Sequence, residues 1–403
     1  MENIEITIDR IAYGGAGVGR LPNGKVCFVH GTAPGETVLV ALTDEKKNFA
    51  NAELIEIVKP SPERIPVECP IPGAAFQHLS YQAENEIKNA QLKDFFQRNV
   101  PAMCRDGEFF EPLIPANELG YRNKITLHAQ EQDGTMVLGY FMEDNRTVQD
   151  IPFCPLADSA VAERLAQLRA DDAFMSTLVD RDSVTIRHAD NGVFYWKNHE
   201  YADTPLLEFS TPAGMLKTAP ESFFQVNQEG AALLQNTIKS VLANLPEPPT
   251  SFLDLYCGSG FFSIAAAKVG IDRIIGADSD PRAIANATEN LKSNGFANAR
   301  FHSFPADRIV GRLMKKGGDF PLLLVDPPRT GLDKVTCRAI ALNPAIINMI
   351  YVSCAPDTLA RDLKILADTG FRMISTVMLN MFPRTAHMES ITLLQRAGEE
   401  SSI

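Results

Sequence analysis

A cysteine and a glutamate stand where this sequence could carry out covalent chemistry. Cys354 follows the apolar run 349–352 (Met-Ile-Tyr-Val), which is typical of a buried strand. Glu389 directly precedes 390–394 (Ser-Ile-Thr-Leu-Leu), which we interpret as the last strand, so its carboxylate would lie at the start of that strand. A thiolate can add covalently to an electron-poor carbon, and a carboxylate can remove a proton. The two residue types therefore predict nucleophilic catalysis with a general base.

Both residues also have plainer interpretations. A lone cysteine is more often a small buried apolar residue than a nucleophile, and we interpret Cys27, Cys104, Cys257 and Cys337 in that way. A lone glutamate is as often a solvated surface acid. The seven cysteines are odd in number and widely spaced, and they form no Cys-x-x-Cys pair. The sequence therefore predicts neither a disulfide framework nor a cysteine-rich zinc site.

A glycine turn and two aspartates outline a cofactor site. Residues 254–263 read Asp-Leu-Tyr-Cys-Gly-Ser-Gly-Phe-Phe-Ser, and glycines at this spacing let the backbone pass close beneath a ligand. Asp278 follows the next apolar run, where a carboxylate can hold the ribose hydroxyls of an adenosine, and Asp326 follows a later one. Ser263 replaces the third glycine of a dinucleotide fingerprint. This order favours S-adenosylmethionine; an NAD-binding domain and ordinary turn glycines are the alternatives.

From Ser251 onward the chain alternates strands and helices. Helical stretches such as 283–294 lie between four apolar runs that are typical of buried strands, namely 252–255, 273–277, 322–325 and 349–352. The pattern predicts an α/β fold with a Rossmann-like, doubly wound parallel sheet. Ligands bind such sheets beyond the carboxyl ends of the strands, which is where Asp278, Asp326 and Cys354 stand.

Two further regions precede this sheet. Residues 1–58 contain short alternating strands and a glycine-rich turn at 13–19, which predicts a small all-β, OB-like barrel. Prolines at 60, 62 and 66 then break the pattern. We expect a mixed α/β, RNA-binding domain over 59–215, with a helix over about 81–97 that packs on the catalytic domain, and the catalytic domain itself over 216–403.

Composition limits the location and the partners of the protein. Of its 403 residues, 45% are hydrophobic and 22% are charged, which is typical of a folded globular protein. No apolar run approaches the length of a membrane span, and acids stand where a signal peptide needs bases, so we expect a cytoplasmic protein without membrane contact. The net charge of -12 argues mildly against a nucleic-acid partner, although a basic groove can lie on an acidic protein.

Taken together, the motifs resemble one family, the RNA uracil-5-methyltransferases. Residues 1–58 resemble the TRAM domain, a small RNA-binding barrel. Residues 222–227 (Ser-Phe-Phe-Gln-Val-Asn) resemble the family's entry into its catalytic domain. Four further motifs match in the family's order: 255–260 (Leu-Tyr-Cys-Gly-Ser-Gly), 325–333 (Val-Asp-Pro-Pro-Arg-Thr-Gly-Leu-Asp), 351–354 (Tyr-Val-Ser-Cys) and 382–389 (Phe-Pro-Arg-Thr-Ala-His-Met-Glu). The resemblance covers nearly the whole chain. It implies a class I enzyme that uses S-adenosylmethionine to methylate carbon 5 of a uridine in RNA. We expect a monomer, and the TRAM-like barrel favours 23S ribosomal RNA over transfer RNA.

The resemblance also implies roles for individual residues. Cys354 falls on the nucleophile that would add to carbon 6 of the uracil, and Glu389 falls on the base. Arg122 resembles a basic RNA contact, with an ordinary surface arginine as its alternative. The cofactor-binding positions fall on Gln225, Tyr256, Asp278 and Asp326.

Two departures from the family's pattern bear on the cofactors. Phe261 stands where the family often has asparagine. Many members carry Cys-Gly-Gly-Cys before 77–81, which holds part of a four-iron cluster, and this chain has Ile71-Pro72-Gly73-Ala74 there. Cys69 and Cys154 remain without an assigned role, and two thiolates are too few for such a cluster. We therefore expect S-adenosylmethionine as the cofactor, without an iron–sulfur cluster or a metal site.

Three other functions stay open. One is a tRNA uracil-5-methyltransferase. A second is an RNA cytosine-5-methyltransferase, but that family usually has a Pro-Cys motif on the fourth strand, where this chain has Asp326-Pro327-Pro328. The third is a non-catalytic RNA-binding paralogue, against which the presence of both Cys354 and Glu389 argues. Binding of S-adenosylmethionine would separate the last from the others.

Overall fold

A closed five-stranded barrel forms the N-terminal region of the computed structural model, which describes residues 3–104, 109–315 and 320–397. The strands pair in the order β1-β2-β3-β5-β4. Alternate residues of β1 point into the barrel, where Ile6 and Ile8 are buried, as the alternating pattern predicts. The strands are β1 (Ile4–Ile11), β2 (Gly17–Arg20), β3 (Val26–Val29), β4 (Thr37–Glu45) and β5 (Phe49–Lys59).

The central region is a five-stranded antiparallel sheet in the order β11-β10-β7-β8-β9, with helix α2 packed on it. A two-stranded sheet, β12 and β13, follows and leads to the C-terminal region. The elements are β7 (Lys124–Gln132), β8 (Thr135–Phe141), β9 (Val148–Asp150), α2 (Ser159–Ala170), α3 (Asp172–Met175), β10 (Ser183–Ala189), β11 (Gly192–Lys197), β12 (Leu207–Thr211) and β13 (Gly214–Thr218). The predicted boundary at 215 falls inside β13, and the three-domain division stays a prediction that limited proteolysis would test.

An eight-stranded sheet forms the C-terminal region, in the order β16-β15-β14-β17-β18-β20-β19-β6. The first five strands are parallel, and β20 runs antiparallel between β18 and β19. This confirms the predicted α/β class and its Rossmann-like sheet. The elements are β6 (Ile114–Pro115), α4 (Gln228–Ala243), β14 (Ser251–Leu255), α5 (Phe261–Lys268), β15 (Arg273–Asp278), α6 (Pro281–Ser293), β16 (Arg300–Ser303), α7 (Ala306–Lys315), β17 (Leu322–Val325), α8 (Lys334–Ala341), β18 (Asn348–Ser353), α9 (Pro356–Ala367), β19 (Phe371–Asn380) and β20 (Glu389–Arg396).

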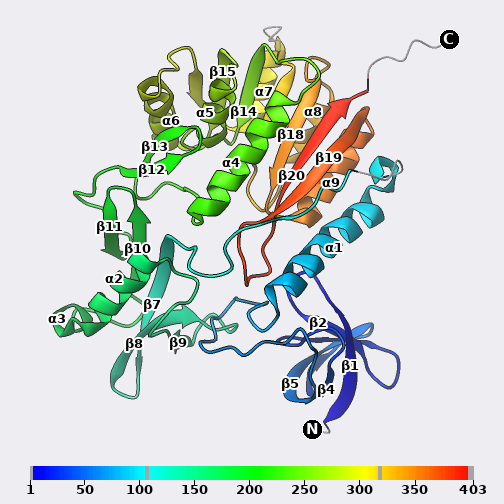
Figure 1. The fold of residues 1–403 in the computed structure, drawn as a ribbon, viewed down its shortest axis with the longest axis vertical. Coiled ribbons are helices and arrows are strands. Elements are labelled where there is room, and N and C mark those ends of the chain that lie inside the picture. Colours follow the sequence, from blue (N-terminus) through cyan, green and yellow to red (C-terminus); the bar gives the residue numbers. More distant parts are fainter. Residues whose placement is uncertain (1–2, 105–108, 316–319, 398–403) are drawn as a thin grey trace.

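Helix α1 (Tyr81–Asn99) lies between the barrel and the C-terminal sheet (Figure 1). It is followed by the short helix η1 (Pro101–Cys104). Leu92 and Phe96 are buried in one core cluster with β17, β18 and α9, while Ile87 packs against the barrel core. The loop that joins β19 to β20, residues 381–388, descends in Figure 1 from the sheet towards this helix. One helix therefore contacts both the barrel and the region that carries the predicted chemistry.

Candidate active site

Most of the predicted site residues lie at the carboxyl ends of four neighbouring strands. Because β15, β14, β17 and β18 are parallel neighbours, the residues at their ends lie along one edge of the sheet. In that order the edge carries Asp278, Tyr256, Asp326 and Cys354. The strands that place them are apolar and buried, so backbone pairing fixes each position.

Glu389 reaches the same edge from an antiparallel strand. Ser353 at the end of β18 pairs with Ser390 in β20, and the Ser390 hydroxyl donates to the Ser353 carbonyl oxygen over 3.2 Å. In an antiparallel pair the next residues along, Cys354 and Glu389, are therefore neighbours across the two strands. The register thus places a thiol beside a carboxyl group.

Burial shapes the electrostatics of this pair. Glu389 is 5% exposed, and its Oε1 has no hydrogen-bond partner among the described residues. Burial, and then the nearby charge of Asp326, raise the pKa of Glu389 well above its usual range. Burial raises the pKa of Asp326 to about 7. Such a carboxyl group holds a proton more tightly than a solvated one, which suits a base.

The Cys354 thiol is half-buried beside these acids. Burial, then Glu389 and Asp326, raise its pKa to about 11, while the guanidinium of Arg329 acts to lower it. Arg329 Nη2 donates to His387 Nε2 over 3.1 Å, and burial together with Arg329 lowers the pKa of His387 to about 4. His387 is therefore neutral at pH 7 and accepts this hydrogen bond. Among the described residues, Arg329 is the cation whose charge lowers the pKa of Cys354 and so favours its thiolate.

The glycine turn after β14 is shaped to receive a ligand. Gly258 has φ 51°, and no atom lies within 4 Å of the position that a Cβ would take there, so the turn is open above it. The Gly258 N–H donates to Asp278 Oδ2 over 3.0 Å, and the Asp280 N–H donates to Asp278 Oδ1 over 2.9 Å. Tyr256 adopts φ 63°, a conformation unusual outside glycine. The strained turn and the fixed carboxylate fit an adenosine with its ribose hydroxyls.

Gln225 is 8% exposed and precedes α4. Asn123, just before β7, and Arg187 of β10 hold the backbone carbonyl oxygen of Gln225: Asn123 Nδ2 donates to it over 3.4 Å and Arg187 Nη2 over 3.2 Å. The Asn123 N–H donates to the carbonyl oxygen of Val226 over 2.8 Å. The central region therefore fixes the backbone that carries Gln225. Arg122, next to Asn123, is half-buried with its guanidinium near the Tyr121 ring.

The segment that departs from the iron–sulfur pattern is packed with apolar side chains. Ile71 and Ala74 are 5% and 3% exposed and belong to the core of the central region. Cys154 belongs to the same core, and Cys69 Sγ donates to the Phe153 carbonyl oxygen over 3.2 Å. Over 3–104, 109–315 and 320–397, no three His, Cys, Asp or Glu side chains are grouped to hold a metal ion. The donor set therefore does not fit a four-iron cluster.

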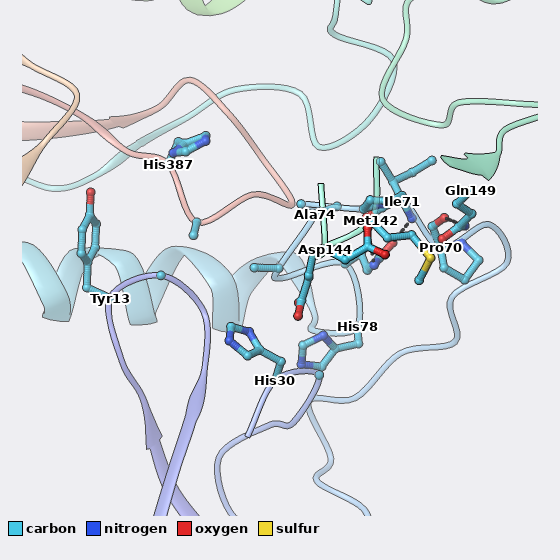
Figure 2. A pocket seen from close by; sticks show the side chains of 18 residues that line it. Tyr13, His30, Pro70, Ile71, Ala74, His78, Met142, Asp144, Gln149 and His387 are labelled. Carbon is cyan, nitrogen blue, oxygen red and sulfur yellow. Dashed lines mark hydrogen bonds between the residues drawn. The ribbon is translucent and has the colours of Figure 1, made fainter. Parts of the chain in front are cut away.

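A cavity of about 740 Å³ opens beside the loop that leads to Glu389. Figure 2 shows Tyr13 and His387 at one end, Pro70 and Gln149 at the other, and His30 and His78 along the barrel side. Burial lowers the pKa of His78, as it does that of His387, so both rings are neutral at pH 7. The cavity is thus lined by rings and neutral groups from several separate segments, with the acids Glu143 and Asp144 at one turn.

Tyr13, in the loop between β1 and β2 of the barrel, lies near Cys354. Its ring packs edge-on against Phe95 of α1 at 5.3 Å between centroids and is 37% exposed. Burial, then Asp357 and Cys354, raise the pKa of the Tyr13 hydroxyl, which shows that it lies near the catalytic edge. A Cβ at Gly15 would collide with Ala75, so the glycine loop packs closely on the segment after the barrel. Sequence reasoning assigned no role to Tyr13, Arg329 or His387, although the last two stand inside the recognised motifs.

In the part of the chain that the structure describes, no helix is long and apolar enough to cross a membrane.

The chain is similar to known proteins along almost its whole length. Residues 206–397 match the family described as tRNA (uracil-5-)-methyltransferase, and residues 2–55 match the TRAM domain. The 23S rRNA (uracil(1939)-C(5))-methyltransferase RlmD of Acidithiobacillus ferrooxidans is 30% identical over 97% of this chain and 97% of its own. That of Photobacterium profundum is 31% identical over 98% of this chain and 94% of its own. The crystal structure of the Pyrococcus abyssi tRNA (uracil-54, C5)-methyltransferase in complex with S-adenosyl-L-homocysteine matches 97% of this chain and 100% of that chain, with a TM-score of 0.75 and 24% identity.

Proposed function

The chain belongs to the RNA uracil-5-methyltransferase family, and we propose from this premise that Cys354 and Glu389 carry out the methylation of carbon 5 of a uridine in RNA. The observation that carries the proposal is the register of β18 and β20, which sets the thiol and the carboxyl group side by side. Covalent activation of a pyrimidine ring needs these two groups on one substrate base.

The two residues divide the reaction between them. The Cys354 thiolate forms a bond to carbon 6, and the electrons of the 5,6 double bond move into the ring as an enolate, which makes carbon 5 nucleophilic. After carbon 5 has gained its methyl group it still carries a proton. Glu389 removes that proton, the 5,6 double bond re-forms, and the bond between carbon 6 and sulfur breaks to release the thiolate. Glu389 must be ionised to accept this proton, and its raised pKa makes the ionised form a stronger base than a solvated carboxylate.

We propose that Gln225, Tyr256, Asp278 and Asp326 hold S-adenosylmethionine, which supplies the electrophilic methyl group and a positive charge near the thiol. The open turn at Gly258 and the Asp278 carboxylate support this assignment. Asp278 would hold the ribose, as acids at this strand end do in related sheets. Asp326 lies at the end of β17, between the turn and Cys354, so its carboxyl group would face the reacting end of the cofactor.

The target base must leave its stack to reach the pair, and the nucleotides beside it must then be held. We propose that the cavity of Figure 2 receives those flanking nucleotides. Its volume lies within the usual range for ligand pockets, and Tyr13 offers a ring on which a base can stack. The carboxylates of Glu143 and Asp144 disfavour a phosphate there and suit the amino group of a base.

We propose 23S ribosomal RNA as the substrate, because the RlmD relatives match almost the full length of the chain and are named for that RNA. The test is mass-spectrometric mapping of 5-methyluridine in ribosomal and transfer RNA from cells with and without the gene. Loss of the mark from 23S rRNA alone would support the proposal, and loss from tRNA alone would select the tRNA alternative. An RNA substrate also supports the expected cytoplasmic location, and analytical ultracentrifugation would test the expected monomer.

A further inference from the structure

The loop between β19 and β20, residues 381–388, is held almost entirely by residues outside those two strands. Four successive carbonyl oxygens, those of residues 381–384, each accept a hydrogen bond from a different segment. The donors are Asn227 Nδ2 to Met381 (2.8 Å), Lys88 Nζ to Phe382 (3.2 Å), the Tyr121 hydroxyl to Pro383 (2.8 Å) and the Phe76 N–H to Arg384 (2.9 Å). Glu389 is the first residue of β20 and pairs with Leu379 of β19, so the two strand ends that flank the loop meet at the proposed base. The contacts that shape the loop therefore also act on Glu389.

Arg384 is the residue where the loop is most constrained. Its φ of 69° is unusual for a residue that carries a Cβ, so the surroundings must maintain it. The Arg384 N–H donates to both carboxylate oxygens of Glu84, over 2.9 and 3.0 Å. Its guanidinium donates to the Leu79 carbonyl oxygen over 2.6 Å and pairs with Glu118. Glu84 in the first turn of α1 thus holds the backbone of Arg384, and Leu79 in the segment before that helix holds its side chain.

Glu84 and Lys88 form a fully buried ion pair on α1. Their side chains are 0% exposed, with 2.8 Å between Lys88 Nζ and Glu84 Oε1. Lys88 Nζ also donates to Asn380 Oδ1 over 2.8 Å, and Asn380 Nδ2 donates back to Glu84 Oε1 over 2.9 Å. Asn380 is the last residue of β19. Among the described residues, every side-chain hydrogen bond of the pair beyond itself is therefore made to Asn380, to the start of the loop or to Arg384.

Burying such a pair costs more than packing apolar residues of similar volume, so its presence calls for a use beyond stability. We propose that Glu84 and Lys88 are positioning residues for Glu389: they fix the 381–388 loop so that the carboxyl group faces Cys354. The inference rests on the proposed function. It predicts that the Glu84–Lys88 pair controls proton removal and leaves thiolate addition unaffected, because in the described part of the chain its side chains bond to residues 380–384 and make no hydrogen bond to β18 or Cys354.

The test compares Lys88→Met with Leu92→Ala, a matched control on the same helix. Leu92 is 1% exposed in the core shared with the catalytic sheet, and its side chain makes no hydrogen bond to the loop. For each full-length variant, thermal unfolding gives the folded fraction, steady-state kinetics with RNA give kcat and KM, and denaturing electrophoresis gives the fraction of enzyme trapped as covalent RNA adduct.

Lys88→Met should lower kcat by on the order of tenfold to a hundredfold, as expected when a reacting group is misplaced, with KM for S-adenosylmethionine unchanged. Its adduct fraction should rise above that of the wild type, since proton removal slows while addition continues. Leu92→Ala should lose stability without gaining adduct. A loss of fold alone can only reduce the adduct, so the two causes move this measurement in opposite directions.

A second variant covers the case in which Lys88→Met does not fold. Glu84→Gln combined with Lys88→Met replaces the ion pair by a neutral pair and should restore stability, yet Phe382 and Asn380 still lack their donor. Its adduct fraction should therefore stay high. A wild-type adduct fraction in the folded double variant would overturn the positioning role. Glu389→Gln serves as the reference: if it traps no adduct, the base assignment itself is wrong, whereas trapping by Glu389→Gln without trapping by the double variant overturns only the role of Glu84 and Lys88.

Discussion

Cys354 and Glu389 face each other, but the chain places them by different means. Cys354 directly follows β18, whose buried residues pair with β17 on one side and β20 on the other. Glu389 follows a loop of eight residues that α1, the segment before it, the central region and α4 all hold by hydrogen bonds. The nucleophile thus follows a strand of the sheet, whereas the base begins a strand after a loop that the rest of the molecule holds.

This difference bears on two proposed steps of the reaction, the addition of the Cys354 thiolate and the removal of the proton by Glu389. On the proposed mechanism, changes in α1 or in the central region act on the loop before Glu389 and so on proton removal, whereas Cys354 follows β18. The TRAM-like barrel leads into α1 and is in this way connected to the proposed proton removal. Substitutions at Cys354 and Glu389 test whether thiolate addition and proton removal can be separated.

The largest effect should come from Cys354→Ala. Without the thiol no bond to carbon 6 can form, carbon 5 is not activated, and neither adduct nor methylated product should be detectable. The assay is transfer of radiolabelled methyl groups to RNA together with denaturing electrophoresis. Cys337→Ala, at a thiol that is 0% exposed in α8, controls for loss of a buried cysteine. An adduct formed by Cys354→Ala would show that another cysteine is the nucleophile.

Glu389→Gln should slow turnover by about 10²- to 10⁴-fold, the usual contribution of a general base. The amide keeps the size of the side chain and cannot accept the proton from carbon 5. Addition and methyl transfer can proceed, so the enzyme should accumulate as a methylated covalent complex that survives denaturation. Mass spectrometry of the trapped complex would detect the methyl group. Turnover near the wild-type rate would remove Glu389 from its role.

How each residue is positioned also decided what the sequence could predict. The strands before Cys354 and Asp326 are apolar runs, and parallel strands share one edge, so both positions follow from the pattern alone. Glu84 and Lys88 have the i, i+4 spacing of an ordinary solvated pair on a helix surface. Their partners stand almost 300 positions further along the chain. No local pattern reveals such a contact, and the approach of Tyr13 to Cys354 escaped prediction for the same reason.

The pH dependence of Cys354 alkylation tests how the sheet edge affects the ionisation of this thiol. With a pKa of about 11, Cys354 is protonated at pH 7, and its thiolate fraction should rise about tenfold per pH unit up to pH 9. Alkylation of the Cys354 peptide by iodoacetamide, followed by mass spectrometry, should show this slope. Arg329→Gln removes the charge that lowers the pKa, so alkylation should slow at every pH in that range.

Cys69 provides the internal control for that experiment. Its thiol is half-buried, and burial and Cys154 raise its pKa without a contribution from Arg329. Its alkylation rate should therefore be the same in the wild type and in Arg329→Gln. If alkylation of Cys354 reaches a plateau below pH 8, other groups favour its thiolate more strongly than Arg329 does, and the sheet edge is not the acidic environment described above.

The smallest effect should come from Tyr13→Ala, which tests whether the barrel acts by binding or by positioning. A base stacked on an aromatic ring contributes about 1–3 kcal/mol, and the partial exposure of Tyr13 points to the lower end, so KM for RNA should rise about fivefold. The adduct fraction should stay at the wild-type value, in contrast to Lys88→Met.

Phe49→Ala is the matched control, because Phe49 is also in the barrel, is also 37% exposed and packs edge-on against another phenylalanine, but does not line the cavity. An unchanged KM for RNA would exclude the cavity as a site for flanking nucleotides. A higher adduct fraction would instead place Tyr13 with α1 among the residues that aim the base.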